Sequence, residues 1–548
     1  MGVSTFLRQM KKPYEDKESF SPKIWANEAH KMLDANLGPN WKEEYVVWDC
    51  AWGTGNLTRD YRFKELYCST LIEDELQLGG KYNSEAVKFQ YDFLSEIGIE
   101  GLPKAAEGLK KAFTEGKKVL FLVNPPYGTA NNAGTKEGDH KGDIAKTGIH
   151  AEMKECGRAK GQLYAQFIYK MVQLGGTVAM FSKPLFLTGC SFKKFREFWF
   201  AKYRMADGML FQASEFADVS SQWGVMFSLW QAGQDERVEW PISLRRSSDD
   251  LARPVESFGE KVLYNLDGKE PCSKWVREEI KGLKAFDAPQ MASALNVKQV
   301  GRGLSASGSI GCLVSGSNSV YKNGTGTFIL SSCATVGPNA GSFSVIPVNF
   351  RKCCALFTAR RTITGKHANW INDKDEYQAP NEKHPEYEQW NTDAIVYSLF
   401  NTASNQSSLR DVEYKGKLWQ IKNEWFWLPR QKILALADNQ GNDEVYQDAK
   451  TYKDRYVYGI LGDLSLSPKA QVVLDKATEL VEKTFEYREM ANDEHPEWCI
   501  NTWDAGYYQV KLLLKAYMRD ELKAFSMLYK ELSDELREGV YEFGFLRR

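Results

Sequence analysis

Five consecutive apolar residues, Val119–Val123, end at two adjacent prolines. A short apolar run that stops at a turn signal is typical of a strand buried on both faces. Proline cannot continue the strand, so Pro125 and Pro126 fix the backbone and hold the Asn124 side chain in one orientation. An ordinary strand-ending turn is the alternative, because Asn-Pro commonly starts turns. The segment from Asn124 to Tyr127, taken alone, does not decide between a polar binding site and an ordinary turn.

The polar groups at this strand end suit one kind of ligand. The Asn124 amide oxygen and the Pro125 carbonyl both accept hydrogen bonds, so together they fit a planar amine whose hydrogens point in two directions. Tyr127 adds a flat aromatic face on which a base can stack. The segment therefore indicates a site for an aromatic ring that carries an amine.

A second motif lies upstream, where the apolar strand Val46–Asp49 runs into a loop with Gly53 and Gly55. Glycines allow a tight turn and a close approach of a ligand to the backbone. Glu73 follows about twenty positions later, at the expected end of a second strand, which suits a carboxylate that binds ribose hydroxyls. Asp92 follows a third strand-like run. Each carboxylate alone is typical of a solvated loop, but their order favours a nucleotide-type site.

Together the segments Asp49 to Leu57 and Asn124 to Gly128 resemble the S-adenosylmethionine-dependent N6-adenine DNA methyltransferases. The order of motifs is similar to the gamma-type subgroup, in which the cofactor motifs come first and the target-recognition region last. The resemblance extends over roughly residues 20 to 232. The chain departs from the pattern at Ser21, where threonine is usual, and at Trp52, which is bulky where a small residue is common.

The resemblance implies an α/β fold with a Rossmann-like methyltransferase domain, S-adenosylmethionine as cofactor, and methyl transfer to a flipped adenine in double-stranded DNA. The catalytic residues it implies are Asn124, Pro125, Pro126 and Tyr127. The cofactor-binding residues it implies are Ser21, Pro22, Asp49, Ala51, Gly53, Gly55, Glu73, Asp92, Phe93 and Asn124. Tyr127 and Phe216 are the residues expected to stack on the target base.

Length and composition agree with these expectations. At 548 residues and 43% hydrophobic content, the chain should form more than one domain. We expect a catalytic domain over residues 1–235, a mixed α/β target-recognition domain over 236–465 and a C-terminal helical region over 466–548. A polar stretch, residues 129–160, follows the proline turn and is expected to be a mobile segment near the target base.

The chain has no apolar run long enough to span a membrane, and its start has no apolar signal core, so we expect a cytoplasmic protein without membrane contact. Ten cysteines lack the Cys-x-x-Cys spacing of zinc sites, and six scattered histidines form no metal pattern. No metal is therefore expected. The net charge of −1 means that any contact with DNA must come from local patches.

The second half contains the strongest local basic patch. Residues 349–366 carry five basic side chains and no acidic one, which suits contact with phosphates or with guanine edges. These side chains are Arg351, Lys352, Arg360, Arg361 and Lys366. A solvated basic face is the alternative. Before this stretch the chain is rich in Gly and Ser, which favours short strands, and after about residue 467 its periodicity predicts helices.

Two other functions stay open at this point. One is a DNA-binding specificity protein whose methyltransferase fold no longer turns over. The other is an amine methyltransferase that acts on RNA or protein, although a glutamine methyltransferase would hardly need so long a second half. A fused nuclease domain would need an acidic pair with Glu-x-Lys spacing after a strand, and the short N-terminal arm has no room for one, so a fused restriction enzyme is disfavoured. A separate restriction endonuclease remains open as a partner.

Overall fold

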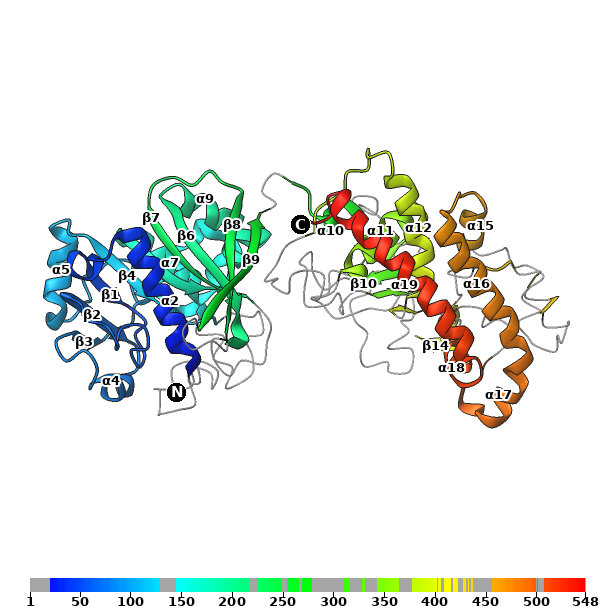
Figure 1. Cartoon of the computed structure of the whole chain (residues 1–548), viewed down its shortest axis with the longest axis horizontal. Coiled ribbons are helices and arrows are strands. Elements are labelled where there is room, and N and C mark those ends of the chain that lie inside the picture. The colour runs from blue at the N-terminus through cyan, green and yellow to red at the C-terminus, as the bar shows by residue number, and fades with distance from the viewer. Residues whose placement is uncertain are drawn as a thin grey trace. The chain divides into compact units, whose positions relative to one another are not determined.

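The computed structural model describes two compact units of the chain, drawn in Figure 1. The first unit holds the described residues through 265, and the second holds those from 269 onward. The described residues are 20–128, 144–215, 224–248, 254–265, 269–277, 310–314, 328–330, 343–363, 377–401, 403–405, 409–414, 417–421, 427–429, 432, 435–436, 456–498, 500 and 507–547.

A nine-stranded mixed sheet forms the centre of the first unit, with the strand order β3-β2-β1-β4-β5-β7-β6-β8-β9. Its strands are β1 (Val46–Asp49), β2 (Glu65–Thr70), β3 (Val87–Gln90), β4 (Val119–Val123), β5 (Thr177–Ser182), β6 (Tyr203–Gln212), β7 (Gly224–Ala232), β8 (Glu239–Ser247) and β9 (Val255–Tyr264). The first five strands run parallel, and β7 is antiparallel to both of its neighbours, β5 and β6. The order 3-2-1-4-5 is that of a doubly wound, Rossmann-like sheet.

Strand β4 is central because both of its faces are covered. All five of its residues are buried. Val119, Phe121 and Val123 join one hydrophobic cluster, whereas Leu120 and Leu122 join another on the opposite face. Alternate side chains of a strand point to opposite faces, so a strand covered on both faces needs a continuous apolar run. The buried strand predicted from this run is confirmed.

Helices cover both faces of this sheet. They are α2 (Phe20–Leu37), α3 (Trp41–Glu44), α4 (Glu73–Gly79), α5 (Glu107–Thr114), α6 (Gly148–Glu152), α7 (Leu163–Leu174), α8 (Leu185–Thr188) and α9 (Lys193–Phe200). Helix α2 packs through Trp25 and Leu33 into the cluster that contains Leu120, and α7 packs through Phe167 and Met171 into the cluster that contains Phe121. Trp25 also stacks on the Phe211 ring of β6, with a ring-centre distance of 3.7 Å, so α2 lies against β6.

The sheet continues past the expected end of the catalytic domain at residue 235. Strand β8 pairs in parallel with β6, through Met209 opposite Ser243, and β9 pairs with β8. The expected functional domains, with boundaries at residues 235 and 465, stay a prediction. The two compact units of the structure are separated between residues 265 and 269.

The second unit combines short strands with long helices around one hydrophobic cluster. Its strands are β10 (Gly311–Val314), β11 (Phe328–Leu330), β12 (Phe343–Val345), β13 (Ser404–Asn405), β14 (Leu409–Tyr414) and β15 (Lys417–Ile421). Its helices are α10 (Cys272–Arg277), α11 (Phe350–Thr362), α12 (Tyr387–Phe400), α15 (Tyr456–Gly462), α16 (Pro468–Thr484), α17 (Arg488–Glu494), α18 (Tyr507–Tyr517) and α19 (Arg519–Glu542). The expected fold class, a Rossmann-like α/β unit followed by a mixed region that ends in helices, is confirmed. No helix among the described residues is long and apolar enough to cross a membrane.

Candidate functional site

The carboxyl ends of β1 and β4 lie side by side at one edge of the sheet. The two strands are parallel neighbours, with Trp48 opposite Phe121, so Asp49 and Asn124 follow at the same edge. From β1 the chain moves outward to β2 and β3, and from β4 it moves in the other direction to β5. Ligands of doubly wound sheets bind in the crevice at such a switch point. The structure therefore brings together the two motifs that the sequence singled out.

The loop after β1 is a compact turn. Gly53 and Gly55 have φ values of 58° and 84°, in the left-handed region that favours glycine. The Asp49 side chain is 1% exposed, and its Oδ1 accepts a hydrogen bond of 3.3 Å from the Ala51 backbone N–H. Asp49 therefore shapes the loop from inside, and its burial leaves little of the carboxylate at the surface.

Two cysteines beside Asp49 are not set up as nucleophiles. Cys50 and Cys68 are buried, and burial first, with the Asp49 carboxylate second, raises the pKa of both thiols well above the ordinary value. A thiol must lose its proton to act as a nucleophile or metal ligand. The chemistry of this edge consequently depends on oxygen and nitrogen groups.

Asn124 and Tyr127 contact each other across the proline turn. The Tyr127 hydroxyl donates a hydrogen bond of 2.8 Å to Asn124 Oδ1. Tyr127 is 6% exposed and belongs to the core cluster below the sheet edge, and this burial raises the pKa of its hydroxyl. The ring expected to stack on a target base is therefore packed inside the unit in this structure.

Glu73 does not end a strand, and this corrects the sequence prediction. Strand β2 ends at Thr70, and Glu73 is the first residue of helix α4, with an exposed side chain. Three consecutive acidic residues, Glu73 to Glu75, suit the first turn of a helix because the helix dipole is positive there. Glu75 accepts a hydrogen bond from the Thr70 hydroxyl, which fixes the start of α4 to the end of β2.

Asp92 and Phe93 follow β3 as expected, but their side chains have different surroundings. Asp92 is exposed, and its Oδ1 accepts a hydrogen bond of 3.0 Å from the Leu94 N–H. Phe93 is 2% exposed and stacks on Phe167 with a ring-centre distance of 5.0 Å. Asp92 is thus accessible to a ligand, whereas the Phe93 ring lies in the core.

Sequence reasoning missed Lys170, a fully buried lysine on α7. Its Nζ donates a hydrogen bond of 2.8 Å to the Tyr91 hydroxyl and lies 4.7 Å from the centre of the Phe93 ring. Tyr91 in turn donates to Glu96 Oε1 over 3.1 Å. Burial lowers the pKa of Lys170 to about 8. A lysine within an apolar helix face was the only signal in the sequence.

His30, also missed, joins α2 to the end of the glycine loop. Its Nε2 lies 2.9 Å from the Leu57 carbonyl oxygen, to which the Nε2–H tautomer donates, and its ring stacks on Tyr61 at 3.4 Å. Burial lowers the pKa of His30 to about 4. The neutral imidazole thus holds helix α2 against the loop.

Several expected residues lie at or beyond the limits of the described chain. Ser21 and Pro22 belong to the first described turn of α2, but their side chains are outside the described residues, as are Phe216 and Lys366. In the polar stretch over residues 129–160, residues 144–160 are packed in this structure, and the mobility of the stretch stays a prediction. There the buried Gln166 amide donates to the carbonyls of Ile144 and Lys160, and its oxygen accepts from Thr147. Residues 129–143 lie outside the described part.

Within the described part of the basic stretch, residues Phe350–Thr362 form helix α11, and most side chains of this helix are buried. Arg360 is 3% exposed, with its guanidinium 5.3 Å from the centre of the Tyr377 ring. The expected contact of Arg360 with DNA does not fit this burial. Arg351 forms an ion pair of 2.5 Å with Glu388, and Lys352 lies over the Trp275 ring at 5.3 Å. Arg361 is partly exposed.

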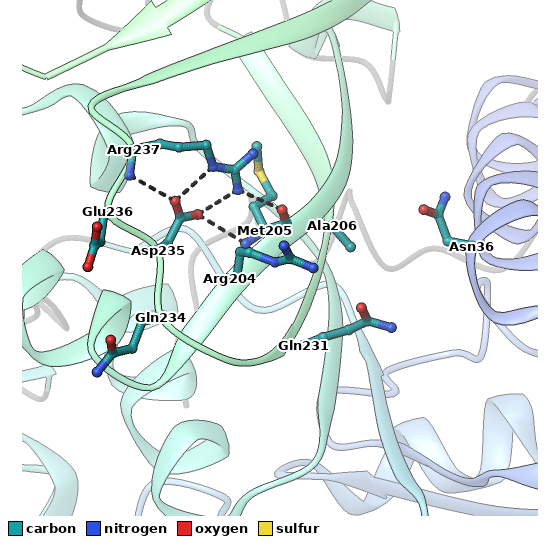
Figure 2. Close-up of a pocket in the computed structure, with 9 residues that line it drawn as sticks. All are labelled: Asn36, Arg204, Met205, Ala206, Gln231, Gln234, Asp235, Glu236 and Arg237. Atoms are coloured by element: carbon teal, nitrogen blue, oxygen red, sulfur yellow. Dashed lines mark hydrogen bonds and ion pairs between the residues drawn. The ribbon is translucent and has the colours of Figure 1, made fainter.

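A pocket of about 750 Å³ lies elsewhere in the first unit. It is lined by the start of β6, the end of β7, the loop that contains Asp235 and Arg237, and Asn36 of α2, as Figure 2 shows. Because β7 is antiparallel to β5 and β6, these ends lie at the edge of the sheet opposite to Asp49 and Asn124. The pocket therefore contains none of the expected site residues.

No protein-family model and no curated protein sequence matches this chain. Among solved structures, the chain is similar to the DNA-bound, ATP-dependent Type ISP restriction-modification enzyme LlaBIII, with 12% identity over 70% of this chain and 39% of that one and a TM-score of 0.36. A modification subunit of a putative type I restriction enzyme from Vibrio vulnificus has 14% identity, coverages of 46% and 53%, and a TM-score of 0.29.

A putative class I S-adenosylmethionine-dependent methyltransferase from Listeria monocytogenes is similar with 12% identity, coverages of 43% and 68%, and a TM-score of 0.28. This chain thus spans about half or less of the two restriction-modification proteins. Similarity at this level carries no argument about chemistry, because function depends on the residues of a site and not on the fold that holds them.

Proposed function

We propose that this protein is a site-specific DNA methyltransferase that transfers a methyl group from S-adenosylmethionine to the N6 amine of a flipped adenine. The observation that carries the proposal is the position of Asn124 beside the loop after Asp49, at the switch point of a doubly wound sheet. One edge of the sheet then offers both a nucleotide-type loop and a pair of acceptors for an amine.

The residues of the loop fit such a cofactor. Gly53 and Gly55 adopt positive φ values, which let the chain turn tightly after β1. Asn56 Oδ1 is buried and has no hydrogen-bond partner among the described residues. A buried acceptor of this kind is usually satisfied by a ligand or a water molecule. Asp49, Ala51, Glu73 and Asp92 complete the proposed binding set, with Ser21, Pro22 and Phe93 expected by resemblance.

When bound, S-adenosylmethionine supplies an electrophilic methyl group on a sulfonium. The work of the protein is to position the amine, whose lone pair is delocalised into the adenine ring. Asn124 Oδ1 and the Pro125 carbonyl accept its two hydrogens, which favours a more tetrahedral nitrogen with its lone pair directed at the methyl group. Positioning of this kind lowers a barrier by up to roughly 7 to 11 kcal/mol. The amine becomes cationic only as the methyl arrives, so no general base has to act first.

Access to the amine requires the adenine to leave the duplex, which costs a few kcal/mol that contacts with the protein must offset. Tyr127 and Phe216 are the proposed stacking partners. Since the Tyr127 ring is buried, its part in stacking requires the proline turn to move when DNA binds. Arg351, Lys352, Arg361 and Lys366 are the proposed DNA contacts in the second unit.

The test is transfer of labelled methyl from S-adenosylmethionine to duplex DNA, with RNA and protein as competing acceptors. We expect label in DNA only, and sequencing of the modified bases then gives the recognition site. Label in RNA or protein would favour the amine methyltransferase alternative. Binding of cofactor and DNA without transfer would favour a silent specificity protein, and a separate restriction endonuclease remains a proposal for a partner.

A further inference from the structure

We infer that Trp52 is a positioning residue of the cofactor site, which sets the distance between the glycine loop and helix α4 through a contact that requires glycine at position 79. The inference rests on the proposed function, because it assigns a role at the same site. It explains why a bulky residue is tolerated in a loop where small residues are common.

Trp52 is tied to the sheet and to its own loop. Its side chain is 3% exposed. The Trp52 backbone N–H donates a hydrogen bond of 3.0 Å to the Ser69 carbonyl of β2, and its own carbonyl accepts one of 3.0 Å from the Gly55 N–H. The indole Nε1 donates to the Thr58 hydroxyl over 3.2 Å. The backbone of Trp52 is therefore fixed by two hydrogen bonds, and the buried indole is oriented by one.

Two glycines face the indole. A Cβ atom at Gly55 would lie 2.9 Å from Trp52 Nε1, and a Cβ atom at Gly79 would lie 2.5 Å from Cη2. Separations below 3.0 Å essentially never occur for real Cβ atoms, so each glycine gives the indole space that no other residue provides. Gly79 is the last residue of α4, whereas Gly55 belongs to the turn after β1. The indole thus lies between the loop and the helix.

Helix α4 is fixed at two points as a result. At its start Glu75 accepts a hydrogen bond from Thr70, and at its end Gly79 contacts Trp52. Glu73 lies in the first turn, close to the Thr70 anchor. If the contact between Gly79 and Trp52 is lost or forced apart, α4 can rotate about the Thr70 anchor. The glycine loop then also loses the indole surface that supports Gly55. Both changes act on the groups proposed to hold the cofactor and on none of those proposed to hold the target amine.

A double-mutant cycle on Trp52 and Gly79 tests this inference, with cofactor affinity measured by titration calorimetry. Gly79→Ala replaces a glycine in a helix, a change that by intrinsic propensity favours folding. Any loss it causes therefore reports the clash with the indole. We expect Gly79→Ala to weaken S-adenosylmethionine binding about tenfold, and Trp52→Phe, which lacks the part of the ring that reaches Gly79, to weaken it by a smaller factor.

The decisive variant is the double substitution. With Phe at position 52 the added methyl group has room, so the double variant should bind the cofactor no worse than Trp52→Phe alone. Gly459→Ala is the matched control, because Gly459 lies in helix α15 and a Cβ there meets nothing within 4 Å. Melting temperatures identify any variant that is unfolded at the temperature of the titration.

The KM for cofactor should rise in the two single variants while kcat at saturating cofactor stays near that of the wild type, which a purely structural loss of active protein would not produce. Unchanged cofactor affinity in both single variants, with a wild-type protein that binds, would overturn the inference and leave the proposed function intact. If Gly79→Ala fails to fold, the affinity of Trp52→Phe decides. Absence of binding by the wild-type protein would overturn the proposed function and the inference together.

Discussion

The Tyr127 hydroxyl donates a hydrogen bond of 2.8 Å to Oδ1 of Asn124, so these two side chains of the proline turn hold each other. A carbonyl oxygen has two lone pairs, and this bond uses one of them. In the proposed function, the second lone pair accepts a hydrogen bond from the incoming amine. Tyr127 therefore orients the Asn124 carboxamide before any target base arrives.

Tyr127→Phe should lower methyl transfer about fivefold and leave cofactor affinity unchanged, because it removes a hydrogen bond worth about 1 kcal/mol and with it the fixed orientation of Asn124. Single-turnover kinetics and calorimetric titration measure the two quantities. The matched control is Tyr203→Phe, since Tyr203 is also buried and donates one hydrogen bond of 2.7 Å, to the Gly176 carbonyl at the opposite edge of the sheet. Equal transfer rates for the two variants would remove Tyr127 from this role.

His30 should make the first unit sensitive to acid. Its pKa is lowered from 6.5 to about 4 by burial, so the unfolded chain binds a proton between these values and the folded chain does not. Stability is then fully present above pH 6.5 and falls as the pH drops toward 4, by about 3 kcal/mol in total. Urea unfolding of wild type and His30→Gln across this range measures the difference. A parallel loss in both proteins would contradict the assignment, and His495→Gln serves as a surface control.

Lys170 should make the stability of the first unit depend on pH in the alkaline range. Burial lowers its pKa from 10.5 to about 8, so between these values the unfolded chain binds more protons and the free energy of unfolding rises with pH, by about 3 kcal/mol in total. Lys170→Met should be more stable than the wild type at pH 7, and this advantage should shrink toward pH 10.5. The difference between the two unfolding curves isolates this lysine from the tyrosines that titrate nearby. A constant difference across pH 7 to 10.5 would show that Lys170 keeps its ordinary pKa.

Alanine substitutions of the adjacent residues Arg360 and Arg361 should affect different properties, stability in the first case and DNA binding in the second. Arg360 is buried over Tyr377, so Arg360→Ala should lower the free energy of unfolding of the second unit by about 1 to 3 kcal/mol and leave the salt dependence of DNA binding unchanged. Arg361→Ala should flatten that dependence by about one unit of slope if Arg361 contacts a phosphate. Unchanged affinity, slope and methylated sequence in Arg361→Ala would make the exposed part of this stretch a solvated face.

The sequence predicted the central part of the sheet because its signals are local. The continuous apolar run of β4 requires cover on both faces, and Asp49 and Asn124 meet because the ends of parallel strands share an edge. The helical periodicity after residue 467 was likewise confirmed by α16 and α18. The apolar run of β4 and the helical periodicity are each contained in a short stretch of sequence.

The missed features depend on contacts between distant segments. Basic residues 349–366 indicated an exposed surface, but α11 packs against α12 and α19, and Arg360 is buried over Tyr377, a partner that no local pattern specifies. The pairing of β8 with β6 is similarly long in range. The sequence places Glu73 at the end of β2, whereas it begins α4. The reason is that Leu71 and Ile72 are apolar and extend the strand pattern in the sequence, although β2 ends at Thr70. The Trp52 indole has room partly because position 79, which lies 27 positions away, is a glycine.

The most direct test of the proposed function is methyl transfer to duplex DNA by Asn124→Ala, with cofactor binding measured on the same preparation. The exposed Asn36, at the opposite edge of the sheet, gives the matched variant Asn36→Ala. We predict that Asn124→Ala loses methyl transfer while it binds S-adenosylmethionine with nearly wild-type affinity, and that Asn36→Ala retains both. Near-normal turnover by Asn124→Ala would contradict the account, because the amine would then need neither the carboxamide nor its orientation.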